Sequence, residues 1–595
     1  MSVLQSLKEA QTREDLAHLL GYKTSGMTHI IYKLAAEQKY KRFTIPKANG
    51  NVRQIDAPIG PLKLLQRRLA NLLNACCDEL ERDNPRHPLS HGFHKSHGFR
   101  PKRSIVTNAQ EHRNKRYVLN LDLQDFFPSI NFGRVRGFFL KNYAFMLHET
   151  VATTIAQIAC HDGALPQGSP CSPILSELVT NILDVRLARF AKKHRVTYSR
   201  YADDITLSTN QKDFPPEIAI RADTEPPTWE LGAALVRKIT GTGFAINTAK
   251  TRMQYRDSRQ SVTGLVVNRK VNIRANYYKL ARSMCHALFM TGSYFRPVAP
   301  TPVTDPPTPL PPPVLTNKLV PLEGILSHIH FVKGSSDRRS DEEKRKEPTA
   351  ARELYRRFLF YKMFIALKRP LIICEGKTDN IYLRFAMRQL SAFHPKLGNM
   401  VDGKFKPAVN LFGYGSKAPS YKDDDIRNRA HDILRISGGT GDLKFFIENY
   451  ERLSKHFKHK PLAHPVIILV DNDKGQKDLF PAINGIFKKA ISLKSTDPFY
   501  HLTANIYVVK TPERGTTGES DIESLFESKV LETKLDGKSF SRSNTKASPT
   551  EYGKYLFAEK VVKPNYTGIK FDNFAPLLSR IEAVIDAHNA PAETL

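Results

Sequence analysis

Cysteine is scarce in this chain, and long apolar runs are lacking. The six cysteines of the 595 residues show none of the paired spacing typical of a zinc site or a disulfide framework. We therefore expect a reducing, cytoplasmic setting. No stretch approaches the roughly 20 apolar residues that span a bilayer, and the first residues carry acids where a signal peptide would be uninterruptedly apolar. These absences argue against a secreted or membrane-embedded protein.

Acidic residues are also few relative to basic ones. The chain has 59 Asp and Glu against 90 Lys and Arg, which gives a formal net charge of +31. This excess favours a polyanionic partner, with nucleic acid as the leading candidate. The alternative is a basic protein that its charge merely keeps in solution. At about 100–200 residues per domain, the length predicts three or four folded units rather than a disordered chain.

Changes in composition divide the chain. Residues 297–321 are so rich in proline that we expect an exposed, extended insertion without helix or central strand. Residues 333–352 are charged and poor in apolar residues, as in a linker or a solvated helix entry. Beyond them, short apolar runs at 371–374 and 465–470 end in acids and precede amphipathic sequence. This pattern is typical of buried parallel strands with crossover helices.

Three aspartates lie in strongly apolar surroundings in the first half. Asp122 belongs to the strand pattern YVLNLDLQDFFPSI, and Asp203 and Asp204 lie at the tip of the hairpin pattern SRYADDITLS. Such carboxylates are costly unless a cation compensates them. Two divalent metals held by these side chains would suit nucleotidyl transfer. An Asp-Asp pair alone is more often ordinary turn chemistry.

The loop LPQGSPCSP at residues 165–173 lies between these two acidic elements, and FTIPKANGNVRQI at residues 43–55 precedes both. This order of a basic segment, an aspartate strand, an LPQG loop and a YADD hairpin resembles reverse transcriptases. The resemblance implies that Lys47 and Arg53 contact the incoming triphosphate and that Gln167 lies against the nucleotide. It also implies that Phe127 excludes a ribose 2′-hydroxyl. The alternative is that the two cations flank a surface hairpin and that Phe127 is ordinary core.

Two further elements narrow the resemblance. The segment GFRPKRSIVTNAQEH at residues 98–112 contains an NA-x-x-H element, and QSVTGLVVN at residues 260–268 contains VTG. Both resemble bacterial retron reverse transcriptases. That family copies part of its own structured noncoding RNA into a small DNA (msDNA), which starts from an RNA 2′-hydroxyl and can stay joined to it. The resemblance places VTG and the following helix in a thumb that grips the RNA. Taken alone, VTG is equally typical of a strand that ends in a glycine turn.

A second set of acids follows the apolar runs of the second half. Glu375 ends one predicted strand, and Asp471 and Asp473 end another. Ligands bind beyond the carboxyl ends of strands in open α/β sheets, so we expect these acids to converge. Asp379 and Glu523 are further candidates. The alternative is that these acids cap the helices that follow, which weighs most for Asp379, Asp442 and Glu523. The glycine-rich segment 437–450 could cradle phosphate or be a plain helix entry.

The EGKTD and DND segments resemble the Toprim domain of topoisomerases, primases and overcoming-lysogenization-type nucleases. The resemblance implies a magnesium-dependent nuclease with one or two metals. The whole chain then resembles retron reverse transcriptases fused to Toprim, in which an effector acts in antiphage defence. A nucleic-acid-binding or primase-like module is the alternative for this half, and a non-enzymatic RNA-packaging scaffold is a third hypothesis. Two acidic sites argue against the scaffold because carboxylates repel phosphate.

The predicted fold is a multidomain α/β and α+β protein, a right-hand polymerase followed by a Toprim-like α/β domain with a mainly parallel sheet. We place fingers and palm at 1–270, thumb at 271–335, a linker or helix at 336–368 and the Toprim-like domain at 369–595. Expected partners are the cognate RNA and its msDNA, dNTPs, Mg²⁺ and a nucleic-acid substrate of the second site. No membrane is expected, and a homo-oligomer is compatible with the sequence.

Overall fold

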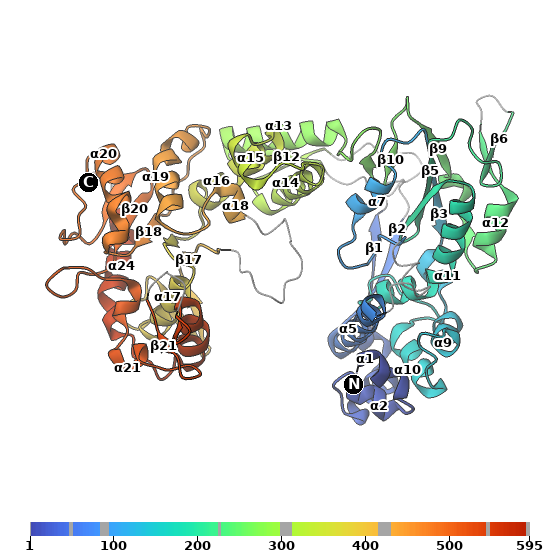
Figure 1. Ribbon diagram of the computed structural model, residues 1–595, viewed down its shortest axis with the longest axis horizontal. Helices are drawn as coiled ribbons and strands as arrows, with labels where there is room; N and C mark the ends of the chain where they lie inside the picture. Colours follow the sequence, from blue (N-terminus) through green and yellow to red (C-terminus); the bar gives the residue numbers. More distant parts are fainter. Residues whose placement is uncertain are drawn as a thin grey trace. The chain divides into compact units, whose positions relative to one another are not determined.

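The structure is a computed structural model that describes residues 2–46, 52–83, 95–223, 228–297, 312–414, 430–542 and 548–590. The chain divides into two compact units (Figure 1). The first comprises residues 1–278, 297–314 and 332–338, and the second comprises residues 279–296, 315–331 and 339–595. The division falls within helices α13 (Ala275–Thr291) and α14 (Leu319–Gly334). The domain boundaries expected from the sequence stay a prediction.

The first unit begins with two short helices that pack against a long one. Helices α1 (Val3–Glu9) and α2 (Arg13–Leu19) share a core with α5 (Gly60–Asp83). The Glu79 carboxylate of α5 accepts the first backbone N–H groups of α1, which have no partner within their own helix. The antiparallel hairpin of β1 (Tyr40–Pro46) and β2 (Val52–Pro58) precedes α5 and is largely exposed.

An antiparallel sheet forms the centre of the first unit. Its strand order is β4-β5-β3-β8, and β9 also pairs with β3. The strands are β3 (Tyr117–Gln124), β4 (Thr197–Tyr201), β5 (Asp204–Thr209), β8 (Ala245–Ile246) and β9 (Arg252–Tyr255). Because β3 lies between its partners, its apolar side chains are almost completely buried. This sheet carries the first set of acids.

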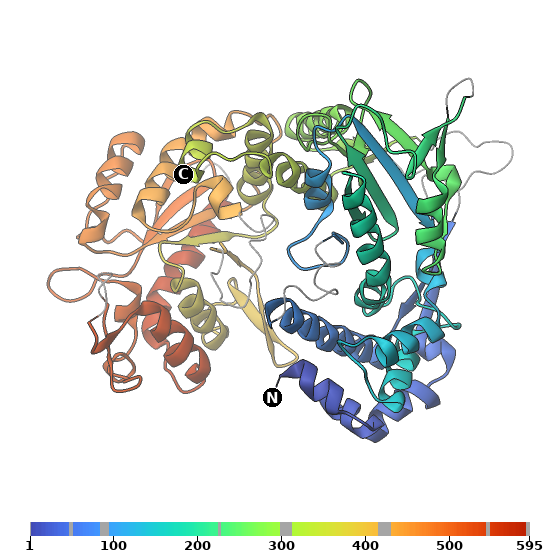
Figure 2. The same ribbon diagram turned by 45° about the vertical axis from the view of Figure 1, so that its right-hand side comes forward.

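Helix α11 (Ser172–Lys193) packs along this sheet, as Figure 2 shows. Pro173 occupies its first turn, where a missing N–H costs no hydrogen bond. Most of its residues are buried, including Glu177 and Asp184. Helices α9 (Phe132–Lys141), α10 (Glu149–Ala159) and α12 (Ala233–Thr240) contribute to the same core. The burial of two acids on α11 requires a cationic partner, which is described below.

The second unit is built on a five-stranded sheet of order β17-β14-β18-β20-β19. The first four strands are parallel, and β19 is antiparallel at the edge. The strands are β14 (Leu371–Cys374), β17 (Asn410–Leu411), β18 (Val466–Val470), β19 (Tyr500–Thr503) and β20 (Ile506–Lys510). The central strands are fully buried, which explains their uninterrupted apolar runs.

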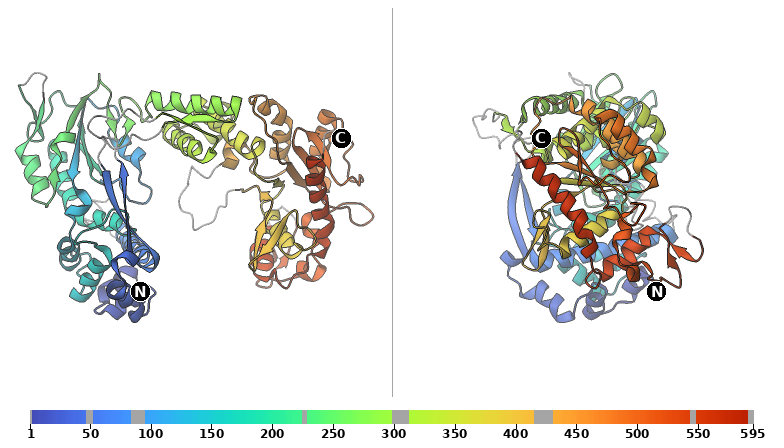
Figure 3. Two further views of the ribbon diagram at one scale, coloured as in Figure 1. Left: turned by 180° about the vertical axis from the view of Figure 1, so that it is seen from behind. Right: turned by 90° about the vertical axis from the view of Figure 1, so that its left-hand side faces the viewer.

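Helices cover both faces of this sheet (Figure 3). Helices α17 (Asp379–Gln389) and α24 (Ala575–Asn589) share one core with alternate residues of β14, β18 and β20. On the other side, α16 (Ala350–Phe360) meets α19 (Thr440–Ser454) through Phe360 and Tyr450. The Tyr450 hydroxyl donates to Asn505 Oδ1 at 2.6 Å, which ties α19 to the start of β20. The architecture is that of a mainly parallel α/β sheet.

The proline-rich segment differs in detail from the expectation. Residues 298–311 lie outside the described residues, but β13 (Val314–Thr316) forms a two-stranded sheet with β12 (Tyr294–Arg296). Helix α14 already begins at Leu319 and holds Pro321 in its first turn, where proline is tolerated. The charged linker contains the short helix α15 (Asp341–Lys346). Within the described ranges, no helix is both long and apolar enough to cross a bilayer.

Candidate active sites

The sheet of the first unit brings together three acids that are far apart in the sequence. In the antiparallel register of β3 and β5, Asp122 lies opposite Asp204. Asp203 immediately precedes β5, and its backbone oxygen accepts a hydrogen bond from Leu123 N at 2.9 Å. The three carboxylates predicted from the sequence therefore share one end of a strand pair.

The turn between β4 and β5 is held by two separate contacts. Ala202 has φ +54°, a left-handed conformation that is unfavourable for alanine. Its backbone oxygen accepts a hydrogen bond from Arg200 Nη1 at 2.9 Å. Gly98 packs so closely that a Cβ there would lie 2.6 Å from Ala202 N. These contacts fix the turn that presents Asp203 and Asp204.

Arg200 lies at the centre of a fully buried ion network beneath this turn. Its guanidinium donates to Asp184 at 2.7 and 2.8 Å and to Glu177 at 3.1 and 3.3 Å. The Tyr198 hydroxyl also donates to Asp184, at 2.7 Å. All three charged side chains are 0% exposed, so none could be buried without the others. The network joins α11 to β4 directly behind the acids.

Burial and mutual repulsion perturb the acids at the turn. Burial raises the pKa of Asp203, and the charge of Asp122 adds to the effect. Burial also raises the pKa of Asp204 to about 6, with repulsion from Asp203 and Asp122 as the next causes. A cation placed among these side chains would relieve both costs.

A lysine that the sequence analysis did not identify already pairs with one of the acids. Lys250 Nζ donates to Asp122 Oδ2 at 2.8 Å, and this bond raises the pKa of the lysine. Asn247 Nδ2 donates to the other oxygen of Asp122 at 3.3 Å. Both residues belong to the turn segment between β8 and β9. Lys250 belongs to no motif with a defined spacing, so its role could be identified only from the structure.

The donor chemistry of this site fits a hard divalent cation, because its ligands are carboxylate oxygens. Among the residues that the structure describes, no three His, Cys, Asp or Glu side chains already converge on a point that could hold an ion. Lys250 instead supplies the positive charge beside Asp122. The bond from Lys250 occupies only the Oδ2 oxygen of Asp122.

The structure describes three of the four residues that we expect to contact the nucleotide. Lys47 lies outside the described residues. Arg53 is exposed on β2, and its positive charge acts on the carboxylate of Asp203. The backbone oxygen of Gln167 accepts Asp56 N at 2.9 Å, which joins the LPQG loop to the hairpin. Phe127 is half-buried, with its ring centroid 5.3 Å from that of Phe126.

The NA-x-x-H element lies behind the β4–β5 hairpin. Asn108 belongs to α7 (Ile105–Glu111), and its Oδ1 accepts the Ser199 hydroxyl at 2.5 Å. The His112 ring bonds Ser199 and Ser208, each at 2.7 Å. Burial lowers the pKa of His112 to about 3, so the ring is neutral at pH 7. In VTG, the Thr263 hydroxyl donates to the Ile105 backbone oxygen at 3.1 Å. The NA-x-x-H element therefore supports the hairpin, and VTG is tied to the start of α7.

Known proteins match the part of the chain that carries this site. Residues 45–271 match the family model described as reverse transcriptase (RNA-dependent DNA polymerase). The chain is 33% identical over 258 residues to the retron Ec86 reverse transcriptase of Escherichia coli, which covers 43% of this chain and 71% of that protein. The chain belongs to the retron reverse transcriptases.

A second relative is matched over a smaller share of its length. The retron Mx65 reverse transcriptase of Myxococcus xanthus is 34% identical over 293 residues, which is 46% of this chain and 62% of that protein. A solved telomerase from Candida tropicalis has a TM-score of 0.31 and 11% identity over 70% of this chain and 65% of its own. That likeness is too distant to support a conclusion. The family model ends before the second unit's sheet.

This retron reverse transcriptase carries its second set of acids at the carboxyl ends of adjacent parallel strands. Glu375 follows β14 and Asp471 follows β18, which pair in register. Glu375 Oε2 accepts Asp471 N at 3.4 Å and the Gln476 amide at 2.7 Å. Asp471 Oδ1 accepts Ile522 N at 3.0 Å. These two acids lie together as the sequence predicts.

Asp379 and Glu523 lie close enough to act on the same centre. Burial raises the pKa of Asp471 well above its usual range, and Asp379, Glu375 and Glu523 add repulsion in that order. Burial likewise raises the pKa of Glu523 to about 7. Lys554, which the sequence analysis also missed, donates to Glu523 Oε2 at 2.9 Å. The centre thus combines crowded acids with one lysine, as the first site does.

One of the acids makes the contact that the capping alternative expects. Asp473 Oδ1 accepts Gly475 N at 2.8 Å at the start of a 3-10 turn, whereas Asp379 Oδ2 accepts Gly376 N at 2.8 Å, which lies before helix α17. In the glycine-rich segment, Ser437 N donates to Asp442 Oδ2 at 2.7 Å and Gly439 N donates to Glu375 O at 3.0 Å. These two amides are therefore satisfied within the protein. Glu375, Asp379, Asp471 and Glu523 therefore lie together with Lys554 at this edge of the sheet.

Proposed function

We propose that this retron reverse transcriptase is an RNA-directed DNA polymerase whose reaction centre is Asp122, Asp203 and Asp204. The pairing of Asp122 with Asp204, next to Asp203, carries the proposal. Three adjacent, partly buried carboxylates, among which Asp203 and Asp204 have raised pKa values, are typical of a site that binds divalent cations. When bound, Mg²⁺ would supply positive charge to the triphosphate and favour ionisation of the attacking hydroxyl.

The surrounding residues have roles in binding and orientation. Arg53 and Lys47 attract the triphosphate, and Gln167 contacts the nucleotide from the loop that joins the hairpin. Phe127 fills the space that a ribose 2′-hydroxyl would need. Lys250 holds Asp122 in place, and its ammonium would supply positive charge to a triphosphate bound beside this carboxylate. Arg200 keeps the turn in its strained conformation.

The proposed product is msDNA, a DNA copy of part of a cognate noncoding RNA, joined to that RNA through a 2′-hydroxyl. Family membership supports this assignment, and the charge of +31 supports a large nucleic-acid partner. The RNA is both template and primer, so the enzyme must hold its folded shape.

The test is cDNA synthesis by purified protein with its cognate RNA and dNTPs. We expect labelled cDNA from the wild type and none from Asp203→Asn with Asp204→Asn, because amides do not replace carboxylates as metal ligands. Asp213→Asn, an exposed acid outside the site, is the matched control and should keep full activity. DNA synthesis by the double variant would refute the assignment.

We further propose that the second unit is a Toprim-type, Mg²⁺-dependent nuclease that acts in antiphage defence and is restrained by the msDNA. Support comes from Glu375 and Asp471 at the ends of adjacent parallel strands and from their crowding with Glu523. Hard oxygen donors suit Mg²⁺, and Lys554 would balance the charge when no metal is bound. A binding or primase-like module is the alternative for this unit.

Glu375→Gln separates these two proposals. The nuclease proposal expects loss of metal-dependent cleavage and of toxicity in cells, with cDNA synthesis unchanged. Glu527→Gln, an exposed acid near Glu523 in sequence, should leave both intact. If Glu375→Gln cleaves nucleic acid as the wild type does, the second unit is not a nuclease of this kind.

A further inference from the structure

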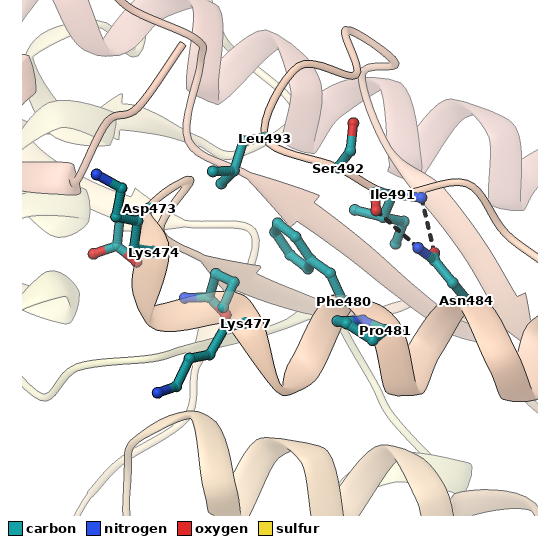
Figure 4. Close-up of a pocket in the computed structure, with 10 residues that line it drawn as sticks. Asp473, Lys474, Lys477, Phe480, Pro481, Asn484, Ile491, Ser492 and Leu493 are labelled. Carbon is teal, nitrogen blue, oxygen red and sulfur yellow. Dashed lines mark hydrogen bonds between the residues drawn. The ribbon is translucent and has the colours of Figure 1, made fainter. Parts of the chain in front are cut away.

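A cavity of about 480 Å³ lies beside the second site (Figure 4). It is formed by the 3-10 turn η5 (Lys474–Lys477), the first turns of α20 (Leu479–Phe487) and residues 491–493. Its volume falls within the range of about 300–1,000 Å³ that small-molecule sites occupy. Its lining includes none of Glu375, Asp379, Asp471, Glu523 and Lys554, and Asp473, a metal ligand predicted from the sequence, lies at its edge.

The walls of the cavity are apolar and braced. Phe480 extends from α20 toward the segment that carries Ile491 and Leu493 (Figure 4). Asn484 fixes this opposite wall, because its amide donates to Ile491 O and accepts Ile491 N, both at 2.8 Å. These two bonds hold the Asn484 amide against the backbone of Ile491. The cavity is therefore a preformed slot beside an aromatic ring.

One buried polar atom in the lining lacks a partner. Gln476 is 1% exposed, and its Nε2 donates to Glu375 Oε2 at 2.7 Å. Its Oε1 is buried and has no hydrogen-bond partner among the described residues. Buried acceptors are rarely left unpaired. A ligand with an N–H donor would therefore suit the Gln476 Oε1 atom. The same side chain links the cavity directly to the carboxylate centre.

The rim of the cavity is charged. Lys474 and Lys477 stand on η5 with exposed side chains, and Lys474 reaches Glu519 only at 3.4 Å. These cations suit a ligand that carries phosphate outside the slot. A flat, largely apolar body with N–H donors at its edge and a phosphate attached is the description of a nucleotide unit.

We propose that this cavity binds one unstacked nucleobase of a nucleic-acid strand whose backbone crosses the carboxylates of Glu375 and Asp471. The base lies beside Phe480 and donates a hydrogen bond to Gln476 Oε1. The phosphate of the same nucleotide contacts Lys474 and Lys477. The proposal rests on the proposed nuclease function, since it gives that site its substrate contact. Holding a base out of the stack also selects single strands over duplexes.

Photocrosslinking of the full chain tests the cavity. The probes are a single-stranded DNA with one 4-thiothymidine, a single-stranded RNA with one 4-thiouridine, and free 4-thiothymidine monophosphate, with Ca²⁺ in place of Mg²⁺. We expect a strand to label the tryptic peptide 478–488, which contains Phe480 and Asn484. Ser492→Trp fills the slot and should lower this labelling about tenfold or more. Ile486→Trp, exposed on the same helix outside the lining, should not.

Labelling of other peptides alone, or equal labelling in Ser492→Trp with an unchanged unfolding midpoint, would overturn the proposal. Labelling by the free monophosphate without labelling by either strand would overturn the assignment to a strand. The nuclease proposal is judged separately by Mg²⁺-dependent cleavage. If the probe labels peptide 478–488 of the wild-type protein but no nucleic acid is cleaved, the nuclease proposal is refuted and the proposed base-binding cavity is supported.

Discussion

Arg200 is the residue on which the geometry of the first site depends most. Its guanidinium compensates two fully buried carboxylates and also holds the Ala202 oxygen. We predict that Arg200→Met lowers the free energy of unfolding by about 3–5 kcal/mol, because Glu177 and Asp184 are left buried without a cation. Urea titration measures this loss. Arg82→Met, which removes the exposed pair with Asp83, should change stability by no more than about 1 kcal/mol.

Arg200→Lys tests whether this residue also positions the acids. Lysine restores one charge but cannot reach Asp184, Glu177 and the Ala202 oxygen together. We expect the variant to recover part of the stability while the turnover number of DNA synthesis stays low. Full recovery of turnover would limit Arg200 to a role in folding.

His112 predicts a pH dependence of stability. Its folded pKa of about 3 lies below the usual 6.5, so the unfolded state binds more protons between these values. Stability from this group is complete above pH 6.5 and is lost as the pH falls, by about 2 kcal/mol at pH 5. His112→Gln keeps polar contacts and removes the titration. Urea titrations should show a shallower decline from pH 7 to pH 5 in the variant, and equal declines would contradict a buried neutral histidine.

The acids could be predicted from the sequence, but their lysine partners could not. Asp122, Asp203 and Glu375 stand in or just after apolar strand patterns, and such placement has few purely structural explanations. Lys250 and Lys554 lie in polar segments, where a lysine is ordinary. Their importance comes from tertiary contacts across long separations in sequence. Asp473 was grouped with Asp471, yet after the strand ends the backbone turns and this side chain caps Gly475.

At the scale of elements, the β4–β5 turn depends on the close approach of Gly98. A Cβ at this position would lie 2.6 Å from Ala202 N, so either the turn or the 95–98 segment must shift. We predict that Gly98→Ala reduces DNA synthesis about tenfold or more, because small displacements of reacting groups are costly. Gly137→Ala, in helix α9 with no atom within 4 Å of the added Cβ, is the control. Primer extension by the two variants, with unfolding midpoints alongside, measures the difference.

Elements with a clear hydrophobic pattern could be predicted from the sequence. Segments whose structure depends on an unusual local position or on distant contacts could not. The apolar runs before Glu375 and Asp471 correspond to β14 and β18, since strands buried on both faces must be apolar throughout. The start of α14 before Pro321 was not predicted, because proline density hid a position that tolerates proline. The NA-x-x-H element was recognised by resemblance alone. Its bonds to Ser199 and Ser208 depend on strands about 90 residues away, which no local pattern reveals.

At the scale of the whole molecule, a net charge of +31 is combined with two acidic centres. If Lys and Arg hold the RNA–DNA product, each phosphate contact releases counterions and binding becomes steeply salt-dependent. We predict that the affinity for the product falls about a thousandfold or more between 50 and 200 mM salt, measured by filter binding. A flat dependence would mean that the excess charge serves another purpose.

The most direct test of the central claim is the nucleic acid that copurifies with the full chain expressed with its cognate RNA. Treatment with RNase and with DNase, each alone, identifies its composition on a denaturing gel. A species that each enzyme shortens but neither removes, and that is absent from Asp203→Asn with Asp204→Asn, is the predicted RNA-linked DNA. RNA alone with the wild-type protein, or the same mixed species with the double variant, would contradict the account.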